Sequence, residues 1–149
     1  MSSFSNFYDD FEVGQVINHP LQKTISTGEH QLFSLLTMNH HLSHISENFA
    51  KQTEFGRTLV NGTYVFSLVV GITVPEVSFN AIANLGYSEV VHLAPVFEGD
   101  TIFASTEVLS KRLSKSRENT GLVEVVTTGF SMNEPVIRLK RSIMIKRHA

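Results

Sequence analysis

The sequence contains no cysteine and no tryptophan, and only 17% of its residues are charged. Without cysteine the chain can form no disulfide, no thiolate zinc site and no thiol nucleophile. Its 12 Lys and Arg residues are balanced by 14 Asp and Glu residues, for a net charge of −2. A protein that binds nucleic acid needs a clustered basic face. We therefore expect no nucleic acid as a partner.

The sequence also lacks a long uninterrupted hydrophobic run. Its most apolar stretch, Val60 to Val74, is broken by Asn61, Gly62 and other small or polar residues, and it is shorter than the ~20 residues that span a bilayer. The start, Met1 to Asp10, has neither the basic nor the apolar region of a signal peptide. No glycine-rich nucleotide fingerprint is present. These absences predict a cytoplasmic protein with no membrane partner and no bound cofactor.

What the sequence has is the composition of one globular domain. It is 149 residues long and 42% hydrophobic, which suits a single core. No linker and no internal repeat divides it. We therefore expect one domain over residues 1–149.

Helices are predicted in the first half of the chain. Ser26 and Glu29 form a capping-box pattern, and a helical spacing of apolar residues continues to Met38. The stretch from Met38 to Ser46 is expected to be irregular, and a short helix is expected over Glu47–Gln52. A longer apolar helix should begin at Asn61 and stop before Pro75. Because it is apolar nearly all round, it is expected to be buried on every side.

The second half of the sequence is predicted to form a β-sheet. Alternating apolar and polar residues separated by turn residues indicate consecutive antiparallel strands. A central helix enclosed by such a sheet is an α+β fold. The expected strands are Ala81–Leu93, Thr101–Leu113, Leu122–Met132 and Val136–Lys146.

Four segments, in order and over almost the whole chain, resemble the MaoC-like hydratases and dehydratases. Thr37–His44 lies where that family has its motif Asp-x-Asn-Pro-x-His, and Phe55–Gly62 is similar to its run into the central helix. Phe7–Gly14 resembles the family's entry segment, and Pro95–Thr101 its strand connection. The resemblance implies a hot-dog fold, an acyl-CoA thioester as substrate, and a homodimer or a larger assembly of dimers with the acyl-CoA tunnel at the interface.

The implied chemistry is hydration of a 2-enoyl-CoA, or the reverse dehydration of a 3-hydroxyacyl-CoA. In the family an Asp and a His hold the water, and backbone N–H groups polarise the thioester carbonyl. The positions that correspond here are Asn39, His44 and Gly62. A glycine at a helix start suits its role, because free N–H groups and the helix dipole stabilise an enolate oxygen.

The sequence departs from the family pattern at the residue expected to be the carboxylate. Asn39 is a neutral amide that cannot accept a proton, which leaves His44 as the best titrating group. His41 replaces the family's Asn, Asn61 replaces the His before Gly62, and Arg57 lies close by in sequence. We regard His41, Arg57 and Asn61 as candidate substrate-binding residues.

The missing carboxylate leaves three interpretations open. The reaction uses histidine alone, with Asn39 orienting the water and His44 or His41 carrying the proton. Alternatively, the substrate brings its own carboxylate, which fits the similarity of this Asn-type motif to mesaconyl-CoA hydratases. In the third, the protein binds the thioester without converting it. A thioesterase is less well supported, because the region around Gly62 to Tyr64 carries no carboxylate.

The histidines His40, His41 and His44 also suggest a metal site, since imidazoles three or four residues apart meet on a helix. The intervening residues do not favour a helix, and no further ligand stands at a suitable spacing. We therefore predict no metal.

Overall fold

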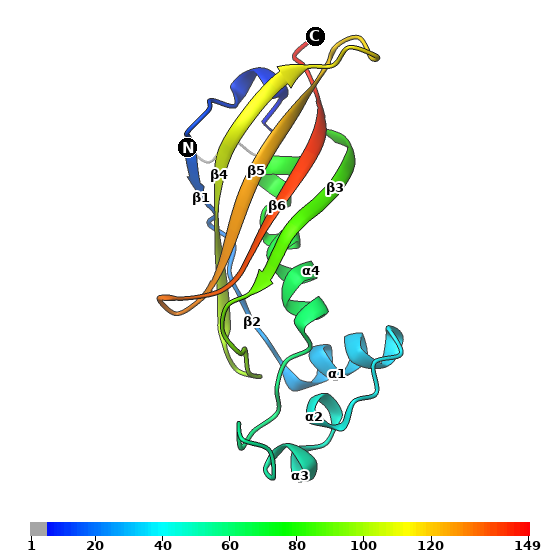
Figure 1. The fold of residues 1–149 in the computed structure, drawn as a ribbon, viewed down its shortest axis with the longest axis vertical. Coiled ribbons are helices and arrows are strands. Elements are labelled where there is room, and N and C mark those ends of the chain that lie inside the picture. The colour runs from blue at the N-terminus through cyan, green and yellow to red at the C-terminus, as the bar shows by residue number, and fades with distance from the viewer. Residues whose placement is uncertain (1–5) are drawn as a thin grey trace.

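The computed structural model describes residues 6–149, which form a long curved sheet with one helix along its inner face (Figure 1). Three short helices gather beyond one end of that sheet, and the C-terminus lies at the other. The helical elements are η1 (Tyr8–Asp10), α1 (Thr27–Leu36), α2 (Leu42–Ile45), α3 (Glu47–Ala50), α4 (Gly62–Ile72) and η2 (Val74–Ser78). The strands are β1 (Val16–Asn18), β2 (Lys23–Thr24), β3 (Ala81–His92), β4 (Thr101–Leu113), β5 (Thr120–Ser131) and β6 (Glu134–Lys146).

The sheet is antiparallel, with the strand order β1-β4-β5-β6-β3 and β2 also paired to β4. The long strands correspond to the four predicted from sequence, so the expected α+β class is confirmed. Strand β3 ends the order and pairs with β6 along one side only. Within the described residues its other side has no strand partner.

Helix α4 packs against the concave face of the sheet through Val65, Val69 and Ile72. The approach is close at Gly129 of β5, where an added Cβ would come within 2.5 Å of a methyl carbon of Val69. A glycine at this position thus lets the helix lie directly on the sheet. The facing strand residues, among them Ile102, Leu139 and Val136, complete this part of the core.

The opposite side of α4 differs from the sequence prediction. We expected burial on every side, but Thr63, Ser67 and Gly71 are exposed, because a sheet covers only one side of a helix. The helix ends at Ile72, and Pro75 lies in the single π-type turn η2 that follows it.

The predicted irregular stretch from Met38 to Ser46 is also partly wrong, because Leu42–Ile45 forms the one-turn helix α2. The ring nitrogen Nδ1 of His41 accepts a hydrogen bond from the N–H of Ser43 and so caps this turn. Histidine is not among the usual capping residues, so the sequence carried no signal for it.

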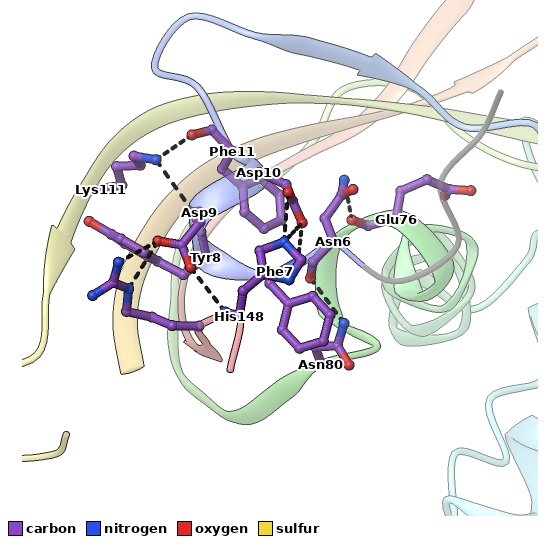
Figure 2. A network of polar contacts seen from close by, with 11 residues as sticks. Asn6, Phe7, Tyr8, Asp9, Asp10, Phe11, Glu76, Asn80, Lys111 and His148 are labelled. Carbon is purple, nitrogen blue, oxygen red and sulfur yellow. Dashed lines mark hydrogen bonds and ion pairs between the residues drawn. The ribbon is translucent and has the colours of Figure 1, made fainter. Parts of the chain in front are cut away.

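The segment around η1 is bound by hydrogen bonds and ion pairs to the last residues of the chain (Figure 2), far from α1–α3 (Figure 1). Asp9 accepts hydrogen bonds from Nε and NH2 of Arg147, and His148 pairs with Asp10. The buried ring of Tyr8 lies against Gly121, where an added Cβ would come within 2.2 Å of it. These contacts close the end of the sheet that is remote from the site described below.

Within residues 6–149, no helix has the length and hydropathy needed to cross a membrane.

Candidate active site

A cavity of about 400 Å³ opens at the N-terminal end of α4, between the loop that enters the helix and the end of β3. The loop before α4 is held in place from two directions. The N–H of Leu59 donates to the carbonyl of Ser43, and the N–H of Val60 donates to the carbonyl of Val96. The cavity is lined by His44, Phe55, Leu59, Val60, Gly62, Val65, His92, Leu93, Ala94, Pro95 and Val96.

His44 stands in the cavity wall with its ring orientation determined by the backbone. Its Nδ1 lies 2.7 Å from the carbonyl oxygen of Leu59. A carbonyl can only accept a hydrogen bond, so Nδ1 carries the proton. In the neutral ring Nε2 therefore keeps its lone pair, and it has no hydrogen-bond partner among residues 6–149. His44 is a half-buried imidazole with a free basic nitrogen.

The surroundings of His44 favour its neutral form. Burial lowers its pKa below the ordinary value of 6.5, and this outweighs the opposing effect of the hydrogen bond to Leu59. Two further histidines, His30 and His41, lie beside this ring. Their ring centroids lie 5.8 and 5.9 Å from that of His44. A neutral imidazole with a free Nε2 can accept a proton from water.

Gly62 lines the same cavity and is the first residue of α4. At this helix start the N–H of Thr63 is capped by the side chain of Asn61, and those of Tyr64 and Val65 donate to the carbonyl of Asn61. The N–H of Gly62 has no acceptor within the described part of the chain. A helix N-terminus also carries the positive end of the helix dipole. The arrangement is suited to hold a carbonyl or enolate oxygen.

A hydrogen-bond relay through the buried His30 fixes the position of this helix start. The Nε2 of His30 accepts from the backbone N–H of Asn61 at 2.8 Å, while its Nδ1 lies 2.8 Å from Glu98. Since Nε2 is the acceptor, the ring is neutral and Nδ1 donates to the carboxylate. The second oxygen of Glu98 accepts from the hydroxyl of Thr27. The relay thus ties α1, the β3–β4 connection and the residue before Gly62 together.

The structure brings together only part of the residue set predicted from sequence. His44 and Gly62 line the cavity, whereas Asn39 and His41 are not among its described lining residues. Asn39 follows Met38, which has a φ of 63°, and its side chain accepts from the N–H of His41. His41 is exposed and caps α2.

Asn61 and Arg57 have other structural roles. The side chain of Asn61 is buried and committed to capping α4, and its amide donates to the hydroxyl of Ser34. The guanidinium of Arg57 stacks 3.6 Å from the centroid of Phe97. It faces a separate surface hollow of about 470 Å³ that also includes Glu98.

Sequence reasoning missed three residues around this site: His30, Glu98 and His92. His30 and His92 carry no local motif, and Glu98 lies in a connection that reads simply as a turn. The only available signal for Glu98 was the similarity of Pro95–Thr101 to the family's connection. Within residues 6–149, no three His, Cys, Asp or Glu side chains are grouped so that they could hold a metal ion.

Comparisons with known proteins point to one family. The sequence profile of the family described as MaoC like domain matches residues 10–129. The chain is 36% identical over 142 residues to a mesaconyl-CoA hydratase of Cereibacter sphaeroides, and 35% identical over 143 residues to a beta-methylmalyl-CoA dehydratase of Chloroflexus aurantiacus. These matches cover 95% of the chain but only 41% and 40% of the relatives. The chain thus spans about two fifths of their length.

Solved structures give the same fold. A putative MaoC domain protein dehydratase from Chloroflexus aurantiacus superposes with a TM-score of 0.90 at 34% identity, over 97% of this chain and 41% of the other. A Mycobacterium tuberculosis protein with a double hot-dog fold superposes with a TM-score of 0.88 at 21% identity, over 96% of this chain and 44% of the other. The expected hot-dog fold is confirmed.

Proposed function

The chain belongs to the MaoC-like domain family, and on that premise we propose that it is a hydro-lyase that adds water to a 2-enoyl-CoA or removes it from a 3-hydroxyacyl-CoA. The single observation that carries the proposal is the pairing of a free imidazole nitrogen on His44 with the free N–H of Gly62 in one cavity. The former is a base for water, and the latter a donor for a thioester carbonyl.

His44 acts on the water. Its Nε2 takes a proton as the water oxygen bonds to the β-carbon of the enoyl group. The hydrogen bond from Nδ1 to Leu59 keeps the ring in the tautomer that this step requires. In the reverse direction the protonated ring gives the proton to the departing hydroxyl group.

Gly62 acts on the thioester. When water adds to the β-carbon, the electron pair of the double bond moves toward the carbonyl and makes its oxygen negative. The N–H of Gly62 and the dipole of α4 stabilise that charge. Loss of one such donor costs other enzymes about 10²–10³ in rate. The relay from Glu98 through His30 to Asn61 keeps this N–H in place.

The proposed substrate is a short branched or dicarboxylic acyl-CoA such as mesaconyl-CoA. The names of the two similar relatives support this class. The modest cavity, about 400 Å³ and mostly apolar in its lining, suits a short acyl group. Asn39, which occupies the position of the family's carboxylate, would not repel a carboxylate that arrives with the substrate.

The remaining predicted contacts concern the CoA portion and the oligomer. The exposed His41 and Arg57 are proposed to contact substrate beyond the cavity, and Asn61 to act through the position of Gly62. The free side of β3 is proposed to pair with the same strand of a second copy, because an open apolar edge requires cover. The exposed apolar residues of this edge are Leu85, Tyr87, Val90 and Val91. The cytoplasmic location stays a prediction.

One observation favours a second candidate, a protein that binds acyl-CoA without converting it. Among the described residues that line the cavity there is no carboxylate. The same absence weighs against a thioesterase, which would use a carboxylate as base or nucleophile.

The test is a hydration assay that follows loss of the enoyl-thioester absorbance with crotonyl-CoA and mesaconyl-CoA side by side. We expect turnover by the purified chain, with preference for mesaconyl-CoA, and its loss in His44→Ala without loss of the folded state. Binding of both thioesters with no turnover would replace the hydratase by the binder. Undiminished turnover in His44→Ala would remove His44 from the mechanism.

A further inference from the structure

His92 lies in the same cavity as His44 and Gly62, and no part of the proposed mechanism has used it. It is the last residue of β3 and pairs with Ile137 of β6. The next residue, Leu93, donates its N–H to the carbonyl of Val136 at 2.9 Å. The backbone that carries the His92 ring is therefore held by the sheet.

The ring of His92 lies against the Cα of Gly62. A Cβ added to Gly62 would be 3.0 Å from both Cε1 and Nε2 of the imidazole. Because glycine has no side chain, the imidazole ring of His92 can occupy the space next to the Cα of Gly62. A thioester held on the N–H of Gly62 would have its carbonyl, and the α-carbon one bond further, beside this ring.

Both ring nitrogens of His92 are without a hydrogen-bond or ion-pair partner in the described part of the chain. His92 differs in this from His30, both of whose ring nitrogens form hydrogen bonds, and from His44, whose Nδ1 forms one. In the single chain the side chain of His92 is also exposed, and it lines a cavity that opens to the surface.

The cavity wall contains only two residues with ionisable side chains among those described, His44 and His92. Hydration of an enoyl thioester requires two proton transfers, one from water and one to the α-carbon. We propose that His92 is the second proton-transfer residue, acting at the α-carbon while His44 acts on the water. The inference rests on the proposed hydro-lyase function.

The step balances as follows in the hydration direction. The water oxygen bonds to the β-carbon and its proton goes to Nε2 of His44. The electron pair of the double bond moves to the α-carbon and takes a proton from the protonated ring of His92. Exchange with solvent then removes the proton on His44 and restores the one on His92. In dehydration His92 removes the α-proton and His44 protonates the leaving hydroxyl.

The experiment compares His92→Gln with a matched control, His40→Gln. His40 is an exposed histidine outside the cavity lining. Glutamine keeps a polar side chain but cannot carry the proton. Both proteins are checked by elution volume and melting temperature against wild type. We expect kcat for crotonyl-CoA or mesaconyl-CoA to fall by about 10²–10⁴ in His92→Gln, with KM changed by less than about threefold. His40→Gln should match wild type.

A second measurement covers the case in which His92→Gln folds poorly. With His92→Asn, deuterium from D₂O should no longer enter the α-position of the 3-hydroxyacyl-CoA, whereas His44→Ala should still exchange that position without losing water. Exchange at the wild-type rate in His92→Asn would overturn the assignment. So would a change confined to KM, or unchanged kcat, in His92→Gln. A wild-type chain that hydrates neither thioester would instead overturn the proposed function itself.

Discussion

Replacement of His30 by alanine should destabilise the protein far more than an ordinary histidine substitution, because His30 is fully buried and satisfies two other groups. The backbone N–H of Asn61, itself buried, would lose its acceptor. A buried donor without a partner costs about 1–3 kcal/mol. Glu98 would lose one hydrogen bond and keep the one from Thr27, which adds about 1 kcal/mol.

Together these losses amount to about 3 kcal/mol of the free energy of unfolding, before any cost of the space vacated by the ring. For a domain of this size each kcal/mol lowers the melting temperature by about 2–4 °C, which gives a decrease of about 6–12 °C. The assay is equilibrium unfolding in urea at one fixed protein concentration, because an oligomer's stability depends on concentration.

Two further variants make this prediction specific. His40→Ala removes an exposed histidine and should change the free energy of unfolding by less than about 0.5 kcal/mol. Glu98→Gln keeps an oxygen that can accept from Nδ1 of His30, so it should cost clearly less than His30→Ala. A cost below about 1 kcal/mol for His30→Ala would refute the relay as a structural element.

Two more predictions concern acid–base behaviour and packing. Burial lowers the pKa of His44 below 6.5, and catalysis requires its neutral form. As the pH falls, kcat/KM should therefore decline only below 6.5. A midpoint above 6.5 in the rate–pH profile would contradict this. Gly121→Ala should cost about 1–3 kcal/mol, because its Cβ would overlap the buried ring of Tyr8. Gly28→Ala, where no atom lies within 4 Å of the added Cβ, should cost nothing in the same urea unfolding measurement.

The amide at position 39 changes how the site is understood. In the family motif this position is a carboxylate, and here the Asn39 side chain accepts a weak hydrogen bond from the N–H of His41. The two groups in the cavity that can carry protons are imidazoles instead. A site with no fixed negative charge in its lining is compatible with a substrate that carries a carboxylate.

The sequence by itself determined the class of fold and supplied two of the proposed site residues through a family resemblance. Apolar periodicity located the central helix and the four long strands, because an element that buries one face has apolar residues at a regular spacing along the sequence. His44 and Gly62 were predicted differently, from the resemblance of Thr37–His44 and Phe55–Gly62 to the motifs of the MaoC-like family.

Only the tertiary structure decided which other residues meet them. His30 contacts Glu98 across 68 positions of sequence, and His92 reaches Gly62 from the far end of a strand. The capping role of Asn61 and the stacking of Arg57 on Phe97 likewise depend on neighbours from other elements. Local patterns record which face of an element is buried, whereas the partners of a buried polar group are set by how separate elements pack. The second imidazole of the cavity therefore had no signature in the sequence.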